Sequence, residues 1–115
     1  MIAHLVLFTP RASLSPEERK GLVADLEAAL RAIPEIRRAR IGRRRVLGYA
    51  YDAVGPVHFE FLVVLEFDST ADLDAYLQHP AHIALGRWFH LGAEAALAED
   101  FELTDAAGLR GLVGD

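Results

Sequence analysis

The chain is organised around the stretch Asp74-Ala75-Tyr76-Leu77-Gln78-His79-Pro80-Ala81-His82, which places a phenol and two imidazoles around a proline. The residue before a proline is disfavoured in the α region, whereas proline itself is well tolerated at the first position of a helix. The stretch therefore predicts that one helix ends near Gln78 and that a second helix begins at Pro80.

Helical spacing predicts where the second imidazole points. If the second helix runs from Pro80 to about Leu97, one apolar or small-residue face contains His82, Leu85, Gly86, Phe89, Ala93 and Ala96. We therefore expect His82 to face inward and His79, beside the break, to lie on the surface. In the first helical turn the peptide dipoles disfavour the imidazolium, so His82 is expected to be the neutral imidazole that a general base requires. A core histidine satisfied by one hydrogen bond is the alternative, and the commoner case for a single inward histidine.

Composition narrows the class of protein. The 115 residues are 52% hydrophobic, enough for one domain with a packed core. The absence of cysteine excludes disulfides, thiolate metal ligands and a cysteine nucleophile. The start, Met1-Ile2-Ala3-His4, enters an apolar run without a basic segment or a cleavage site, and no apolar run is long enough to cross a bilayer. We expect a cytoplasmic protein without a membrane partner.

The chain is acidic on average, but one short segment of it is strongly basic. The net charge of -5 argues against a nucleic-acid partner. Half of the twelve basic residues nevertheless fall within nine positions, as Arg37, Arg38, Arg40, Arg43, Arg44 and Arg45. Because no aromatic residue interleaves them, we interpret the cluster as a solvated strand edge that resists aggregation, with anion or nucleic-acid binding as the alternative.

Hydrophobic periodicity and helix-start signals predict the order strand, helix, strand, strand, helix, strand. The strands are expected at Ile2 to Phe8, Ile36 to about Tyr51, Phe59 to Phe67 and Asp100 to Thr104, with helices at Pro16 to Ile33, from Ser69 to Gln78, and from Pro80 to about Leu97. Gly55-Pro56 signals a turn between the second and third strands. Residues 105–115 contain three glycines and are either a frayed tail or a strap on a neighbouring subunit.

This order is the α+β ferredoxin-like arrangement, βαββαβ, in which the helices cover one face of a four-stranded antiparallel sheet. The first and third strands are apolar on both sides, so the second face also needs a cover. A homodimer whose sheets face each other is the simplest cover, since a monomer would expose a large apolar patch.

Particular residues also resemble a known family. They are Met1-Ile2-Ala3-His4-Leu5-Val6-Leu7-Phe8, Ile33-Pro34, Gly42, Phe67-Asp68-Ser69, Tyr76 with His79-Pro80-Ala81-His82, and Asp100-Phe101-Glu102. This set resembles the stress-responsive dimeric α+β barrel (Dabb) family over residues 1 to about 104. The resemblance implies a ferredoxin-like protomer that pairs through its sheet into a dimeric α+β barrel, and leaves the tail at residues 105–115 unexplained.

The resemblance also implies site residues, because the family includes plant polyketide cyclases. In that branch the inward histidine of the His-Pro-Ala-His motif is the catalytic base, and a tyrosine six residues earlier assists it. Here those residues are His82 and Tyr76, and His4 corresponds to a first-strand histidine that lines the pocket. All three residues occur widely in the family, so they permit cyclase chemistry without requiring it.

The residues suggest two readings of function. In the first, the chain acts on a small aromatic or poly-β-keto metabolite in an apolar pocket. The expected lining is Val6, Phe8, Leu22, Leu26, Leu77, Leu85, Gly86, Phe89, Ala93 and Ala96. In the second, the chain is a non-catalytic stress-responsive dimer or a binder of small hydrophobic ligands. No cofactor is expected, and His79, His82 and Asp74 lack the further ligand that a metal site would need.

Overall fold

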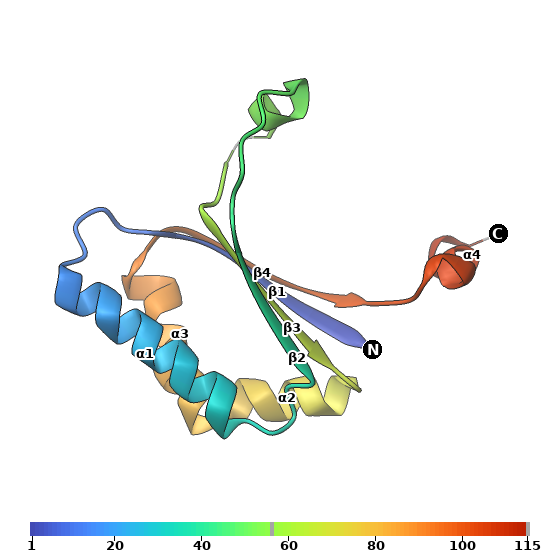
Figure 1. The fold of residues 1–115 in the computed structure, drawn as a ribbon. Helices are drawn as coiled ribbons and strands as arrows, with labels where there is room; N and C mark the ends of the chain where they lie inside the picture. Colours follow the sequence, from blue (N-terminus) through green and yellow to red (C-terminus); the bar gives the residue numbers. More distant parts are fainter. Residues whose placement is uncertain (56, 115) are drawn as a thin grey trace.

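The strands and helices follow the order expected from the sequence (Figure 1). The structure, a computed structural model, describes residues 1–55 and 57–114. The elements are β1 (Ile2–Pro10), α1 (Pro16–Ala32), β2 (Arg38–Arg43), the 3-10 turn η1 (Ala50–Ala53), β3 (Phe61–Phe67), α2 (Thr70–Gln78), α3 (Pro80–Leu91), β4 (Ala93–Glu102), the 3-10 turn η2 (Ala106–Gly108) and α4 (Leu109–Val113).

The four strands form one antiparallel sheet in the order β2-β3-β1-β4. Helices α1, α2 and α3 all lie on one face of this sheet (Figure 1). The expected ferredoxin-like α+β fold is thus confirmed. Among the described residues, no helix combines the length and the apolar character that crossing a membrane demands.

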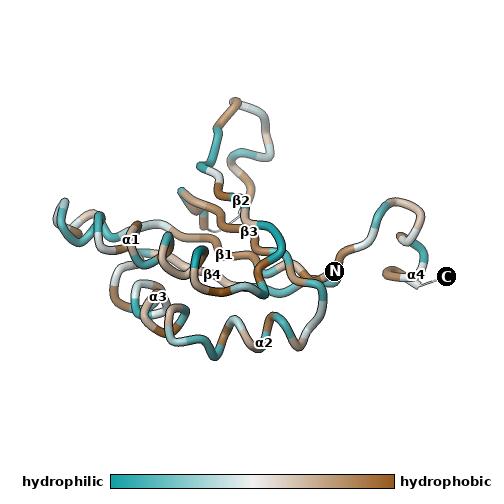
Figure 2. The backbone as a smooth tube through the Cα atoms, turned by 60° about the horizontal axis from the view of Figure 1, so that its bottom comes forward, coloured by the Kyte–Doolittle hydropathy of each residue, from teal (hydrophilic) through white to brown (hydrophobic). Residues whose placement is uncertain are grey.

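The helical face of the sheet holds the buried core. Phe67, Ile33 and Leu65 are its largest fully buried side chains, and Leu73 and Tyr76 from α2 pack against them. On the opposite face, the central strands carry an apolar strip that no helix of residues 1–55 and 57–114 covers, and Figure 2 shows the hydrophobic colour along β1 and β3. The strip contains Leu5, Leu7, Leu62, Val64, Leu97 and Phe101, which alternate with the residues that face the helices.

The boundary between α3 and β4 differs from the expected one. The helix ends at Leu91, and β4 begins at Ala93, well before the expected Asp100. A Cβ on Gly92 would lie 2.8 Å from the Trp88 ring, so only glycine fits where the chain leaves the helix. Ala93 and Ala96 therefore lie on a strand and not on the helical face assigned to them. Alanine suits either conformation, and pairing with β1 decides between them.

The second strand is also shorter than expected. It ends at Arg43, and residues 44–55 and 57–60, here called the arm, lie between the end of β2 and the start of β3. One Asp52 carboxylate oxygen accepts hydrogen bonds from the backbone N–H groups of Leu47, Gly48 and Tyr49, at 2.7–3.1 Å. Gly48 has φ +89, a conformation that does not continue a strand. Within the turn expected at Gly55-Pro56, Pro56 lies outside the described residues.

The C-terminal segment forms a 3-10 turn and then the short helix α4, beyond the end of β4 (Figure 1). Asp105 caps the turn by accepting a hydrogen bond from the Gly108 N–H at 3.1 Å. The segment is therefore helical over much of its described length. Its role as a strap on a second subunit stays a prediction.

Replacement of Phe67 by alanine should test the position of the core. Phe67 is 0% exposed, so Phe67→Ala should lower the free energy of unfolding by about 3–5 kcal/mol through lost burial and a residual cavity. Urea unfolding followed by circular dichroism, at one protein concentration, measures the change. Val23→Ala on α1, where Val23 is 53% exposed, is the control and should change the value by less than about 1 kcal/mol. Equal losses in the two variants would contradict this core.

Candidate functional site

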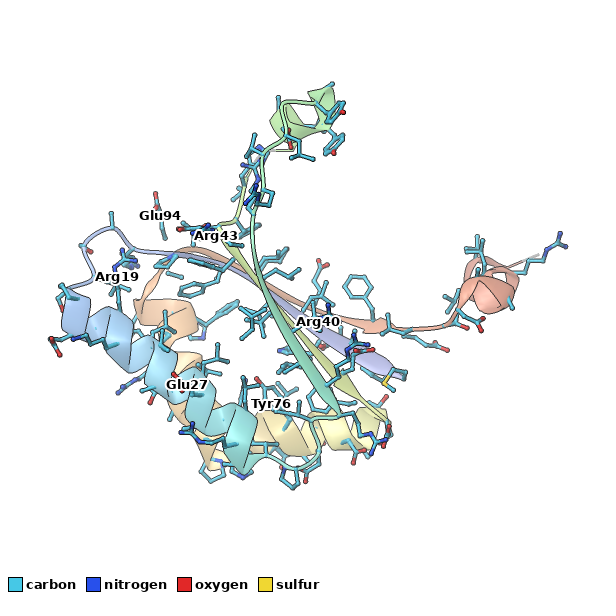
Figure 3. The ribbon with its side chains drawn as sticks, in the orientation of Figure 1. Arg19, Glu27, Arg40, Arg43, Tyr76 and Glu94 are labelled. Carbon is cyan, nitrogen blue, oxygen red and sulfur yellow. The ribbon has the colours of Figure 1, made fainter. Side chains whose placement is uncertain are left out.

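Three polar rings lie in a row beneath the sheet. His4 comes from β1, Tyr76 from α2 and His82 from α3. The Tyr76 ring centroid lies 5.7 Å from that of His4 and 4.6 Å from that of His82. Figure 3 shows Tyr76 on the side of α2 that faces the sheet. The sequence singled out these three residues, and the fold brings them together.

The junction between α2 and α3 makes this arrangement possible. His79 is extended, with φ -67 and ψ 137, and it ends α2 and caps α3 at the same time. Its Nδ1 accepts a hydrogen bond from the Ala81 N–H at 3.0 Å, and Pro80 takes the first helical position. Because the chain turns there, residues six apart in sequence face one another. The expected break is thus confirmed, although His79 is half-buried and was expected on the surface.

The hydrogen bond of His82 fixes its tautomer. Its Nδ1 lies 3.0 Å from the carbonyl oxygen of Leu77. A carbonyl oxygen can only accept, so Nδ1 must carry the proton, and in the neutral ring Nε2 keeps a free lone pair. Burial lowers the pKa of His82; the bond to Leu77 opposes this shift, and charge on His4 adds to it. His82 is therefore neutral at neutral pH and has one basic nitrogen available.

Tyr76 has the opposite character, that of a neutral donor. Its side chain is 2% exposed, and burial raises its pKa to about 12. The Nδ1 atoms of the two neighbouring imidazoles are directed to Asp100 and to Leu77, so neither of these hydrogen bonds uses the Tyr76 hydroxyl. A protonated phenol beside a neutral imidazole is a pairing of an acid with a base.

Asp100 is a site residue that the sequence did not reveal. Its Oδ1 lies 2.6 Å from Nδ1 of His4, and the two residues are direct neighbours across β1 and β4. His4 is buried at 5% exposure, whereas the Asp100 side chain is about half exposed. Asp100 holds the His4 ring and directs its other nitrogen, Nε2, away from β4. Only the register between the first and last strands identifies this pair, and sequence alone does not give that register.

The expected pocket lining lies around the helices and the helical face of the sheet. Val6 and Phe8 are on β1, Leu22 and Leu26 on α1, Leu77 on α2, Leu85, Gly86 and Phe89 on α3, and Ala93 and Ala96 on β4. All are half-buried except Ala93, which is buried. Only Leu77 and Leu85 pack against the buried core cluster. A Cβ added to Gly86 would meet no atom within 4 Å, so there is open space beside this helix.

Two open surface grooves lie elsewhere. One, with a volume of about 340 Å³, lies at the base of the arm and is lined in part by Leu7, Leu62 and Arg43. The other, of about 400 Å³, lies on α1 between Arg19 and Glu27, both labelled in Figure 3. Neither groove is lined by the three rings. The candidate site therefore rests on the ring row and the space near Gly86, and not on these grooves.

The arginine cluster is divided among several contacts. Strand β2 is an edge strand, and all of its residues are exposed. Arg37 pairs with Asp68 at 3.3 Å and Arg38 with Glu66 at 3.7 Å.

Over the described part of the chain, no three His, Asp or Glu side chains converge as a metal site would require.

The fold and the site together define a class: a ferredoxin-like chain with an imidazole, a phenol and a second imidazole in one row. The sequence matches the Dabb family, the stress responsive A/B barrel domain, over residues 2–103. The chain belongs to this family, which confirms the resemblance of its opening strand and its His-Pro-Ala-His motif. No curated protein matches the chain.

Solved structures share the fold. A hydroxynitrile lyase from Passiflora edulis has a TM-score of 0.74 at 17% identity, with 91% of this chain and 94% of that chain covered. A Dabb protein with a ferredoxin-like fold from Mesorhizobium loti has a TM-score of 0.69 at 24% identity, with 90% of this chain and 97% of that chain covered. A dimeric ferredoxin-like protein of unknown function from Thermobifida fusca has a TM-score of 0.67 at 25% identity, with 89% of this chain and 90% of that chain covered.

The lowered pKa of His82 leads to a prediction about stability. Below its ordinary pKa of 6.5 the unfolded chain binds a proton that folded His82 resists. The contribution of His82 to the free energy of unfolding is thus complete above pH 6.5. It is lost as the pH falls through the lowered pKa of His82 in the folded chain. His82→Gln, whose amide can still donate to Leu77, should lose less unfolding free energy than the parent between about pH 7 and about pH 5.

Urea unfolding at the two pH values measures this difference. His90→Gln is the matched control, because it removes an exposed imidazole from the same helix. It should keep the pH dependence of the parent. An unchanged pH dependence in His82→Gln would show that His82 protonates as readily in the folded chain as in the unfolded one.

Proposed function

We propose that this chain is an enzyme that removes a proton next to a carbonyl group of a small aromatic or poly-β-keto metabolite, as a polyketide cyclase does. The observation that carries the proposal is the contact between His82 and Tyr76, a neutral base and a neutral acid whose ring centroids are 4.6 Å apart. Two such groups in one half-buried site are what a proton abstraction with a charged intermediate requires.

In this mechanism Nε2 of His82 takes the proton from a carbon between two carbonyl groups. The electron pair of the broken C–H bond moves into an enolate, and the negative charge gathers on oxygen. The Tyr76 hydroxyl donates a hydrogen bond to that oxygen, and its pKa of about 12 keeps it a donor throughout. The enolate carbon can then attack a second carbonyl of the same molecule, after which the imidazolium returns its proton.

His4 and Asp100 act as positioning residues in this scheme. The bond of Asp100 to Nδ1 of His4 holds the imidazole in one orientation on the far side of Tyr76. Nε2 of His4 is then free to contact the Tyr76 hydroxyl or a polar end of the substrate. The apolar lining of β1 and α3, with the open space beside Gly86, would accommodate the remainder of the molecule.

Kinetics on the two central residues test the mechanism. A thermal-shift screen with an aromatic β-keto acid, a linear poly-β-keto thioester and an aromatic hydroxynitrile first finds a bound compound. Its turnover is then measured by mass spectrometry of the products. His82→Gln should lower kcat by about 10²–10⁴-fold, and Tyr76→Phe by about 10²–10³-fold, while KM changes little.

His90→Gln, on the exposed side of α3, is the control and should retain the parent kcat. Full turnover in His82→Gln would refute the proposed base. Stabilisation by a compound without any turnover in the parent would favour the non-catalytic binder. Turnover of the hydroxynitrile alone would keep the general base and replace the substrate class.

We also propose that the chain forms a homodimer through the uncovered face of its sheet. Across that face Arg40, Val64, Leu5 and Glu99 form one row, with the basic residue on edge strand β2 and the acidic residue on edge strand β4. A twofold axis parallel to the strands would place Arg40 of each copy against Glu99 of the other, with the apolar pair in the middle. The row is thus complementary to itself.

Charge reversal tests this arrangement. Arg40→Glu or Glu99→Arg alone should raise the dimer dissociation constant about tenfold or more, since two symmetric attractions become repulsions. The double variant should return to within a few-fold of the parent. Sedimentation equilibrium measures the constants. Arg31→Glu with Glu27→Arg, an exposed pair on α1, is the charge-matched control and should have no effect. A failure of the double variant to restore association would exclude this register.

A further inference from the structure

We propose that the arm of one copy closes the ligand pocket of the second copy at the end farthest from the ring row, so that each site is built from both chains. The inference rests on the homodimer and the pocket proposed above. It goes beyond them because it assigns the arm, through Tyr49, Tyr51 and Val54, a place in the site of the partner.

The arm has a shape of its own and an apolar surface. Its tip is held by the Asp52 carboxylate, which binds three consecutive amides, and by a hydrogen bond from Arg44 to the Asp52 carbonyl oxygen at 3.1 Å. Tyr49 and Tyr51 stack at 5.9 Å and are 64% and 66% exposed, and Val54 is 71% exposed. Exposed aromatic side chains on an internally fixed projection are typical of an interaction surface.

The direction of the arm decides where it can dock. It rises from the end of β2 and the start of β3, on the side of the sheet opposite the helices (Figure 1), and Figure 2 shows the same projection from another angle. Stacked sheets lie about 10 Å apart, so an arm that stands up from the face continues past the sheet of a second copy. It then reaches the layer of the partner's helices.

The twofold axis decides which end of the partner the arm meets. An axis parallel to the strands keeps like ends together, and it lays β2 and β3 of one copy over β4 and β1 of the other. The arm therefore meets the end where β1 finishes and β4 begins. There α3 ends at Leu91, which is 72% exposed. The Arg11 N–H donates to the Gly92 carbonyl oxygen at 2.8 Å, which joins this end of the helix to the sheet.

The groove at the base of the arm supports the same placement. Leu7 and Leu62, which line it, lie on the uncovered face, and Arg43 lines it from the end of β2. Under the proposed axis, the start of β4 of the second copy, with exposed Glu94, approaches this corner. Figure 3 shows Arg43 and Glu94 at the same end of the sheet, so the rotation exchanges a basic corner with an acidic one.

The end that the arm meets is the end of the proposed pocket that lies farthest from the ring row. From His4 to Phe8 along β1 the chain advances about 13 Å, and from His82 to Phe89 along α3 it advances about 10 Å. Both run in the same direction, from the ring row towards the α3–β4 junction. Phe8 and Phe89 remain half-buried there. The stacked tyrosines of a second copy would cover them and exclude water from the site.

Cysteine cross-linking tests this contact, because the chain contains no cysteine of its own. One copy carries Tyr51→Cys, and a second, co-expressed copy with a larger tag carries Leu91→Cys. After mild oxidation, a non-reducing gel should show a disulfide-linked pair that contains both tags in most of the purified mixed dimer. Tyr51→Cys with Val23→Cys, on the outer side of α1, is the matched control and should give little of this product.

Light scattering on the same samples separates the possible failures. If the protein is a dimer but the disulfide from position 51 to position 91 forms no better than the one from position 51 to position 23, the arm proposal is overturned and the proposed homodimer remains. A monomer would overturn both. A third sample, a single chain that carries both Tyr51→Cys and Leu91→Cys, tests the alternative: a disulfide within one copy would show that the arm folds back on its own chain, and that result would also refute the proposal.

Discussion

The junction at His79 and Pro80 is the constraint on which the candidate site depends. On a continuous helix, Tyr76 and His82 would be rotated by about 240° from one another and would face different surroundings. Proline has no N–H to donate, and the His79 side chain supplies Ala81 with the acceptor that the preceding turn would otherwise provide. A second helix therefore starts with a new direction. The same residue that ends one helix thus brings the two rings together.

The remainder of the site depends on contacts distant in sequence. His4 and Asp100 are 96 residues apart and meet only because β1 lies between β3 and β4. Tyr76 links the helix junction to the pairing of β1 with β4. Its ring centroid lies 5.3 Å from that of Phe67 in the core, and its ring also packs against both imidazoles. One side chain is therefore both core and candidate donor. Its burial raises the pKa that keeps the donor protonated.

Local signals in the sequence predicted the elements that they control. Helix α1 begins at Pro16 as expected, behind a capping box formed by Ser15 and Glu18, and α3 begins at Pro80 as expected. Prediction failed where a distant partner or a side-chain contact decides the backbone. Ala93 to Leu97 fit a helix or a strand, and only pairing with β1 makes them a strand. Tyr49 and Tyr51 favour a strand, yet Asp52 holds the preceding amides in a turn.

The arginine cluster shows how the fold changes the meaning of a sequence pattern. In the sequence alone the cluster suggests an anion-binding site, but alternation along β2 directs successive side chains to opposite faces of the sheet. Arg38 and Arg40 share the uncovered face, where Arg38 pairs with Glu66 on its own sheet and Arg40 lies at the basic end of a row that finishes at Glu99 on the other edge. A positive edge and a negative edge on one apolar face are complementary to a rotated copy of themselves. Because the two charged ends lie at opposite edges, the same row disfavours a copy stacked with like edges together, so it would select orientation as well as partner.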